Sequence, residues 1–319
     1  TGAYDGLTFG AVERVGSHRA ATTDLPQECF WRIRAGQAIL AAGALERPIA
    51  FPMNDRPGIM MASGLRTYLN RYGVCPGEKI TLFATNDDAH RTAVELIDAG
   101  IGVEAVLDAR PDALAQGDYR LIPGAQVVGT KGRHGVTELT YRRGSTEAKL
   151  NTDCLAVSGG WNPSVHLTCH LGARPVWNAD LEAFVPANGA VPGLHPAGAC
   201  AGTYGLAGCL ADGVAAAEAA LKTLGKRVRK PDLPVAEDDP GTGTALWLVE
   251  GKGRAWLDFA NDVTSKDIKQ SAAEGYRSVE HMKRYTTQGM APDQGKNSNI
   301  SALALLADAA GRAIPETGT

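Results

Sequence analysis

Short apolar and β-branched runs separated by turn residues fill the first 42 residues of the chain. These runs cover 7–15, 29–34 and 37–42. Gly16, Pro26 and Gly36 stand between or beside them. Runs of this length between turn residues predict short antiparallel strands.

The third run ends in small residues, which include Ala42 and Gly43. A strand that ends this way lets its backbone approach a bound dinucleotide closely, because no bulky side chain intervenes. A plain strand followed by a turn explains the same residues. The nucleotide interpretation gains support from 46–48 (Glu-Arg-Pro), which follows directly, and from the order of elements further along the chain.

Between Gly77 and Arg110 the pattern predicts one β-α-β unit, with a strand over 79–85, a helix over 88–99 and a strand over 103–108. In a Rossmann lobe the first strand-to-helix turn carries G-x-G-x-x-G. Here 84–90 is Ala-Thr-Asn-Asp-Asp-Ala-His. Two carboxylates at a helix N-terminus complement its dipole and repel a pyrophosphate. We therefore expect this lobe to keep the fold without a nucleotide site, and Asp108 to be a solvated loop acid.

After further strands predicted over 126–129, 136–141 and 154–158, small residues at 158–160 mark the return of the first lobe. The glycine-rich segment 193–205 then leads into an alanine-rich helix over 206–224, closed by Gly225. A strand, a glycine-rich turn and a helix N-terminus together predict an anion site. Flavoproteins with two dinucleotide domains usually carry Gly-Asp at this turn, whereas this chain has Gly198 and Ala199. The substitution argues against ordinary FAD and leaves room for another dinucleotide.

The C-terminal third divides into a linker and a small helical domain. Residues 226–244 are rich in Pro, Gly and charge, as linkers are. Thr264 with Asp267 predicts one helix start, and Ser278 predicts a second. In chain order, we expect 1–74 in the first dinucleotide domain, 75–160 in an inserted degenerate one, 161–225 back in the first, 226–255 as linker, 256–310 as helical domain, and 311–319 as linker to a further domain.

Composition excludes some functions. The 319 residues, 44% hydrophobic and 21% charged, suffice for two compact domains. The net charge of -3 arises from 32 basic and 35 acidic residues spread along the chain, so no nucleic-acid surface is expected. No uncharged apolar stretch reaches the roughly 20 residues of a membrane span. Six cysteines without paired spacing indicate a reducing cytoplasm, and the start at Thr1 suggests a fragment.

Isolated chemical candidates give no catalytic or metal site. His166, Cys169 and His170 have metal-like spacing, but one cluster without a second pair is a weak zinc signal, and a structural role is favoured. The other histidines are scattered, and no Ser, His and Asp set follows from their order.

Four segments together resemble the alpha subunit of heterotetrameric sarcosine oxidase: 42–48, 54–58, 66–74 and, most specifically, 274–299. The resemblance covers essentially the whole chain. It implies a two-dinucleotide-domain, flavoprotein-like (Rossmann-type) α/β fold followed by a small helical domain like a cluster-less bacterioferritin-associated ferredoxin. A first G-x-G-x-x-G unit would precede this fragment, and a folate-binding domain would follow it.

The resemblance implies a tightly bound, non-catalytic NAD in the first lobe, FMN at an interface with the beta subunit, FAD within that partner, and gamma and delta subunits as further partners. The assembled enzyme would oxidise sarcosine with oxygen, a CH-NH oxidation, and pass the one-carbon unit to tetrahydrofolate or release formaldehyde. The fragment alone is expected to be inactive. The residues expected to line NAD, mostly through backbone groups, are Ala42, Gly43, Gly198, Ala199, Tyr204 and Leu206.

Related hydrogen cyanide synthase and opine oxidase subunits bind a [2Fe-2S] cluster through four cysteines, whose positions fall here at Asp258, Ala260, Asp293 and Ser298. Cluster irons need thiolates, so no such cluster is expected. Two alternatives stay open. One is an active NAD(P)H-dependent FAD oxidoreductase subunit of the opine oxidase or hydrogen cyanide synthase type, and the other is a purely structural scaffold.

Overall fold

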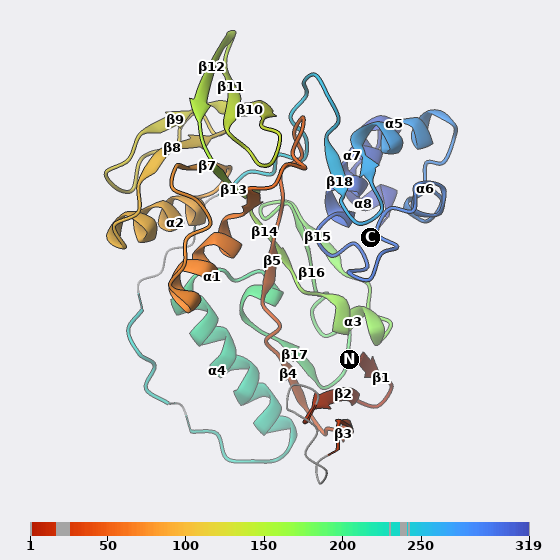
Figure 1. Cartoon of the computed structure of the whole chain (residues 1–319). Coiled ribbons are helices and arrows are strands. Elements are labelled where there is room, and N and C mark those ends of the chain that lie inside the picture. The colour runs from red at the N-terminus through yellow and green to blue at the C-terminus, as the bar shows by residue number, and fades with distance from the viewer. Residues whose placement is uncertain (1, 17–25, 230, 237–240, 242, 319) are drawn as a thin grey trace. The chain divides into compact units, whose positions relative to one another are not determined.

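The chain forms two compact units in a computed structural model that describes residues 2–16, 26–229, 231–236, 241 and 243–318 (Figure 1). The first unit comprises Thr1–Ala44 and Asn162–Pro240, and the second comprises Leu45–Trp161 and Gly241–Thr319. The chain passes between the units near two short strands, β5 (Ala44–Glu46) and β14 (Trp161–Pro163).

An antiparallel sheet of three strands begins the first unit. It contains β1 (Gly2–Tyr4), β2 (Thr8–Arg14) and β3 (Glu28–Arg34), in that order. The strands predicted over 7–15 and 29–34 therefore pair as a meander, with Val12 opposite Phe30. The segment 17–25 between them lies outside the described residues.

The rest of the first unit is built around a parallel pair. Strand β4 (Ala38–Leu40) pairs in parallel with β17 (Leu194–Pro196), so the antiparallel pairing expected for the run at 37–42 is wrong. Its partner comes from more than 150 residues away, which a local pattern does not show. A 3-10 turn, η1 (Gly198–Ala201), and helix α4 (Leu206–Thr223) follow β17. Helix α3 (His166–His170) and the hairpin β15 (Val176–Asn178) with β16 (Ala183–Val185) complete this unit.

The second unit is organised on a five-stranded parallel sheet in the order β6-β13-β7-β8-β9. The strands are β6 (Ile59–Met61), β13 (Cys154–Ser158), β7 (Ile80–Ala84), β8 (Val103–Asp108) and β9 (Leu121–Pro123). Helices α1 (Ala62–Tyr72) and α2 (Asp87–Asp98) bury Leu65, Ala93 and Leu96 against one face. The predicted β-α-β unit at 79–108 is confirmed to within two residues at every end.

A second, antiparallel sheet covers the other face of the parallel sheet. Its strands β10 (Ala125–Lys131), β11 (Glu138–Arg143) and β12 (Thr146–Asn151) follow one another in order. Val127 and Leu139 pack with Phe83 and Leu107 in one buried cluster. Strands β10 and β11 were expected, but the polar strand β12 was not.

Residues 243–318 complete the second unit. Strands β18 (Trp256–Asp258) and β19 (Val263–Thr264) precede helices α5 (Ser265–Ala273), α6 (Val279–Thr286), α7 (Asn299–Ala310) and α8 (Ile314–Thr317). Thr264 and Asp267 form the expected capping box, and Ser278 caps α6. Helix α8 lies within the linker expected over 311–319.

The compact units follow different boundaries from those expected. Residues 45–74 join 75–160 because β6 pairs with β13 at the edge of the same sheet. The segment expected as linker up to 255 is also packed within the second unit from 243 onward, where Val249 is 2% exposed. Asn54 exchanges two hydrogen bonds with the backbone of Trp256, at 2.9 and 2.8 Å.

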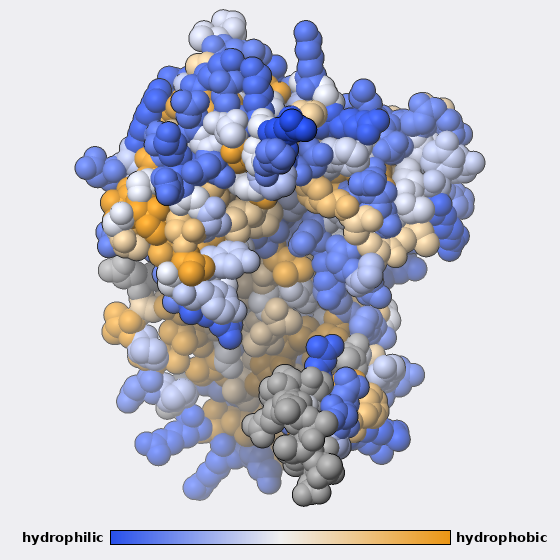
Figure 2. All heavy atoms as spheres, viewed as in Figure 1, coloured by the Kyte–Doolittle hydropathy of each residue, from blue (hydrophilic) through white to orange (hydrophobic). Residues whose placement is uncertain are grey.

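No helix in the described ranges is long and apolar enough to cross a membrane. Figure 2 shows hydrophilic residues over much of one face of the molecule, with hydrophobic residues between them. All six cysteines are free thiols.

Candidate nucleotide-binding site

The carboxyl ends of β4 and β17 meet at one edge of the first unit. The amide of Ala197 donates to the carbonyl of Leu40 at 2.9 Å, so the segments that follow the two strands leave the sheet side by side. Buried Cys200 lies below them, with its thiol 2.9 Å from the same carbonyl. Ligands of open parallel sheets bind outside the carboxyl ends of the strands. The structure thus places the two predicted segments, 42–43 and 198–206, after neighbouring strands of one sheet.

Two glycines in these turns adopt backbone conformations that favour glycine. Gly43 has φ of 69° and Gly198 has φ of 68°. A Cβ on Gly43 would meet no atom within 4 Å, so open space adjoins its backbone. Ala42 is exposed and Ala199 half-buried. The end of β4 is thus accessible at Ala42, whereas Gly198 after β17 is buried.

Helix α4 begins at this edge without a capping side chain. Its N-cap is Gly205, and its first turn contains no acidic residue. The first residue of the helix, Leu206, is 61% exposed. The amides of a first helical turn have no partner within the helix and carry the positive end of the dipole, so they favour an anion.

One predicted contact is already used within the chain. The amide of Gly198 donates to Oδ2 of Asp212, on the second turn of α4, at 3.3 Å. The Gly198 amide is therefore not available to a ligand as expected, and the Gly198 carbonyl accepts from the amide of Thr203 at 3.2 Å. Only the small size of Gly198 remains as a contribution to the site. Sequence reasoning missed Asp212, because nothing in the helical pattern distinguishes it from a solvated acid.

The corresponding turn of the second unit is closed. The side chain of Asn86 caps α2 by accepting from the amide of Ala89, and its amide group donates to Ser158. Asp88 forms a bidentate ion pair with Arg66, at 3.0 and 2.9 Å. Asp87 pairs with Arg110 at 2.7 Å. Carboxylates thus occupy the helix N-terminus where a pyrophosphate would bind.

The expectation that Asp108 is a solvated loop acid is wrong. Asp108 is fully buried, and its Oδ2 lies 2.8 Å from Nε2 of His90 and 2.7 Å from Nη2 of Arg110. Burial would raise the pKa of the Asp108 carboxyl, but the hydrogen bonds from His90 and Arg110 outweigh it and hold that pKa below its ordinary value of 3.8. Tyr119 closes the network, with its hydroxyl 2.8 Å from Nδ1 of His90.

A chain segment lies directly on this closed turn. Gly243 forms an antiparallel bridge with Asn86, and the amide of Thr244 donates to the carbonyl of Thr85 at 3.0 Å. A Cβ on Gly243 would lie 3.0 Å from the Cβ of Asn86, so the two backbones are close. The glycine and proline content of this segment suggested a linker and hid its role as a cover.

Two of the four positions at which cluster cysteines of related subunits are expected, Asp258 and Ser298, are buried in a polar network. Asp258 accepts from the amides of Ala260, Asn261 and, 31 residues away, Gly289. Ser298 accepts from the side chain of Gln288 at 2.7 Å. These donors hold together the loops after β18 and α6. Asp293, by contrast, is exposed.

The remaining sequence candidates belong to the first unit, where the amide of Ser164, just before α3, donates to the carbonyl of Gly43 at 3.0 Å. His166, Cys169 and His170 lie on the short helix α3. No group of three or more His, Cys, Asp or Glu suited to a metal ion occurs among the described residues.

Comparison with known proteins gives a match to one family model and several relatives. Residues 252–319 match the model of the sarcosine oxidase A3 domain. The whole chain is 47% identical to the sarcosine oxidase alpha subunit of Rhizobium meliloti (strain 1021) and 38% identical to that of Corynebacterium sp. (strain P-1). Over 86% of its length it is 25% identical to an opine oxidase subunit of Rhizobium meliloti (strain 1021), of which it covers 70%.

The chain spans only about a third of the sarcosine oxidase subunits, 33% and 35% of their lengths. Among solved structures, L-proline dehydrogenase from P. horikoshii superimposes with a TM-score of 0.71 at 18% identity, over 91% of this chain and 56% of that one. This likeness confirms the predicted α/β fold class.

Proposed function

We propose, starting from the homology of the whole chain to a segment of sarcosine oxidase alpha subunits, that its first unit holds a dinucleotide that takes no part in electron transfer. The observation that carries the proposal is the contrast between two helix N-termini. That of α4 has a glycine N-cap and no acid in its first turn, whereas that of α2 carries two paired carboxylates beneath a covering segment. The dinucleotide we propose is NAD.

The residues fit such a group. Gly43 offers backbone next to open space, and the first turn of α4 offers amides to a pyrophosphate. Ala42, Ala199, Tyr204 and Leu206 would lie along the nucleotide. Ala199 stands where a flavin-binding lobe has an acid, which supports NAD rather than FAD. Bound here, NAD would supply binding energy that favours the folded unit, since a ligand stabilises the state that binds it.

The larger reaction belongs to the assembled protein. We propose that the complete protein, with beta, gamma and delta partners, contributes to sarcosine oxidation: sarcosine, oxygen and water yield glycine, hydrogen peroxide and formaldehyde, with tetrahydrofolate as alternative acceptor of the one-carbon unit. The redox chemistry would come from FAD in the beta partner and from FMN at an interface with this chain. The compartment we propose is the cytoplasm.

The test is the nucleotide content of the assembled complex. Denaturing the complete complex and separating the supernatant by chromatography is expected to release NAD. Release of no nucleotide would overturn the proposal and leave a purely structural role for this segment.

Similarity to the opine oxidase relative favours one other candidate, an NAD(P)H-dependent flavin reductase. In that case NADH added to the assembled complex without amine substrate would bleach the flavin absorbance. The covered turn of the second unit opposes this function, because it gives an exchangeable pyridine nucleotide no pyrophosphate site. We expect the flavin spectrum to remain unchanged.

A further inference from the structure

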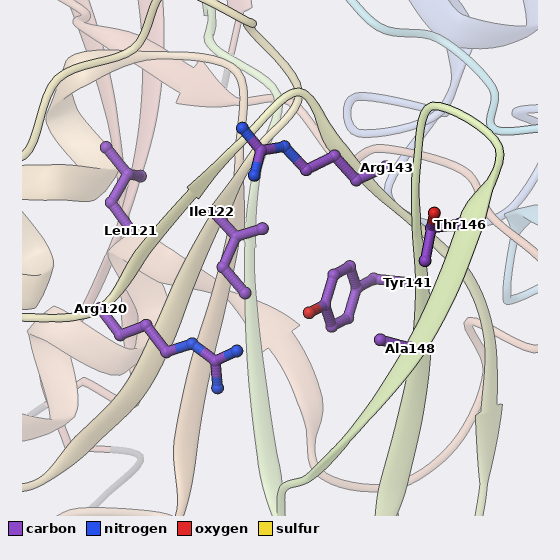
Figure 3. A pocket seen from close by; sticks show the side chains of 7 residues that line it. All are labelled: Arg120, Leu121, Ile122, Tyr141, Arg143, Thr146 and Ala148. Atoms are coloured by element: carbon purple, nitrogen blue, oxygen red, sulfur yellow. The ribbon is translucent and has the colours of Figure 1, made fainter.

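A cavity of about 440 Å³ lies in the second unit between β9 and the hairpin of β11 and β12. It is lined by Arg120, Leu121, Ile122, Tyr141, Arg143, Thr146 and Ala148 (Figure 3). It lies outside the first unit and involves none of the residues assigned to the dinucleotide. Its volume falls within the range of small-molecule sites.

The register of the hairpin explains which side chains face this cavity. Tyr141 lies opposite Ala148, and Arg143 opposite Thr146. Successive strand residues point to opposite faces, so these four share one face, while Arg142 and its partner Glu147 point to the other. The lining face is apolar near the core, where Tyr141 is 8% exposed, and becomes polar toward the turn at Gly144.

Both arginines lack partners within the part of the chain that the structure describes. Neither Arg120 nor Arg143 forms an ion pair or a side-chain hydrogen bond there, and no Asp or Glu lines the cavity. Figure 3 shows Arg120 entering from just before β9 and Arg143 from β11, with Ile122 between their guanidinium groups in this view and the Tyr141 ring at one side, its hydroxyl pointing into the space. Two uncompensated cations around one concave space favour an anion, and guanidinium binds carboxylates and phosphates through paired N–H groups.

We propose that this cavity binds a small organic anion whose carboxylate or phosphate lies between Arg120 and Arg143 and whose apolar or ring portion lies against Ile122 and Tyr141. The apolar side chains at the base can contact the apolar part of such a ligand, which an inorganic anion lacks. The Tyr141 and Thr146 hydroxyls supply further hydrogen bonds. The proposal does not depend on NAD binding in the first unit.

Calorimetric titration of the assembled complex with four probes tests the ligand class. Adenosine 5'-monophosphate and benzoate combine an oxyanion with a ring, inorganic phosphate has only the anion, and adenosine has only the ring. We expect the two ring anions to bind more tightly than phosphate, and adenosine not to bind at this cavity. If phosphate binds as tightly as the ring anions, the apolar contribution is refuted; no saturable binding of either ring anion up to about 1 mM would overturn the whole proposal.

Variants locate the binding. Arg120→Gln and Arg143→Gln should each weaken the binding of the ring anions about tenfold or more, because each variant loses a charge-assisted hydrogen bond. Arg142→Gln removes the same charge from the opposite face of the hairpin and is the matched control. Equal weakening in R142Q would show a general effect of charge, and unchanged binding in R120Q and R143Q would show that the probes bind elsewhere. Either result would refute the site.

Both test arginines are exposed and form no ion pair among the described residues, so their replacement leaves the packing intact. Unfolding temperatures of the three variants should agree with that of the parent complex. A variant that unfolds early is replaced by Arg→Lys at the same position, which keeps the charge and loses the paired geometry. The lysine variant is expected to bind the ring anions more weakly than the parent complex does. Equal affinity would contradict the proposed guanidinium contact.

Discussion

Asp108 ends β8 at the place where a nucleotide-binding lobe of this fold has an acid for a ribose hydroxyl. Its carboxylate is instead bound by His90 and Arg110 and is fully buried. A buried carboxylate is tolerated when it is paired, and removing its charge leaves the partners uncompensated. In this chain the residue is therefore an internal structural group.

Asp108→Asn is therefore expected to lower the free energy of unfolding of the second unit by about 3–5 kcal/mol at neutral pH. Because the folded-state pKa of Asp108 lies below 3.8, its stabilisation is fully present above that value and is lost as the pH falls through the folded-state pKa. Urea denaturation of the assembled complex over a pH series measures this difference.

Asp112→Asn is the control, since Asp112 follows the same strand and is exposed. It should leave the urea midpoint unchanged. Asp108→Asn should also leave the NAD content unchanged, whereas loss of NAD in this variant would return Asp108 to the role of a nucleotide contact. A stability gap that closes already near neutral pH would contradict the depressed pKa.

At the scale of elements, the N-terminus of α4 differs from that of α2, which carries two acids. Its first turn lacks an acid, and Leu206 projects from it with 61% of its surface exposed. A glutamate at this position would favour the helix through its dipole and would leave packing intact. It would also place a negative charge beside the proposed pyrophosphate. Because the substitution favours the helix and opposes the anion, an effect on binding can be told from an effect on folding.

Leu206→Glu is expected to remove most of the bound NAD. Two like charges about 5 Å apart repel by about 3 kcal/mol at an effective dielectric constant of about 20, which corresponds to roughly a hundredfold weaker binding. The nucleotide released on denaturation measures the outcome. Leu224→Glu makes the same substitution at the far end of α4, where Leu224 is 49% exposed, and should retain NAD. Equal nucleotide content in both variants would show that NAD does not bind at the start of α4.

A single buried carboxylate joins two loops of the small helical domain. Asp258 accepts from three backbone amides, and that of Gly289 lies beyond α5 and α6. The resemblance predicts a cluster cysteine of related subunits at this position, where this chain has an acceptor for backbone amides instead. Removing the acceptor leaves the buried amide of Gly289 unsatisfied, at a cost of about 1–3 kcal/mol.

Asp258→Ala should therefore destabilise residues 252–319 locally, with faster hydrogen exchange at Gly289 and in α6 than in the parallel sheet. Hydrogen exchange of the assembled complex followed by mass spectrometry resolves the two regions. Asp308→Ala changes an exposed acid on α7 and should leave exchange unchanged. Unaltered protection of Gly289 in D258A would show that the carboxylate does not hold this loop.

Across the whole molecule, the sequence predicted elements well and long-range contacts poorly. Strand β8 matches its prediction at both ends, because buried periodicity and a following turn are local signals. Strand β12 was missed because its sequence, TEAKLN, is polar and largely exposed. The burial of Asp108 depends on His90, 18 residues away on another element, and on packing that no local pattern encodes.

The candidate site divides in the same way. Glycine content and a helix start located the turn after β17, since both are local features. The cover formed by Gly243 and Thr244 on the second turn could not be predicted, because it joins segments more than 150 residues apart. The missing glycine fingerprint predicted a lobe without a nucleotide site. The structure adds the ion pairs and the covering backbone that occupy the turn before α2.

Two turns from a parallel strand to a helix, one with an uncapped helix N-terminus and one covered, predict a definite stoichiometry. The complete complex is expected to release one NAD for each copy of this chain, because the ion pairs of Asp87 and Asp88 and the Gly243 bridge occupy the second turn. Quantitative chromatography against protein concentration gives the ratio. Two nucleotides per chain would show that the second lobe also binds. One nucleotide per chain that persists in Leu206→Glu would assign it to the second lobe and reverse the roles proposed for the two.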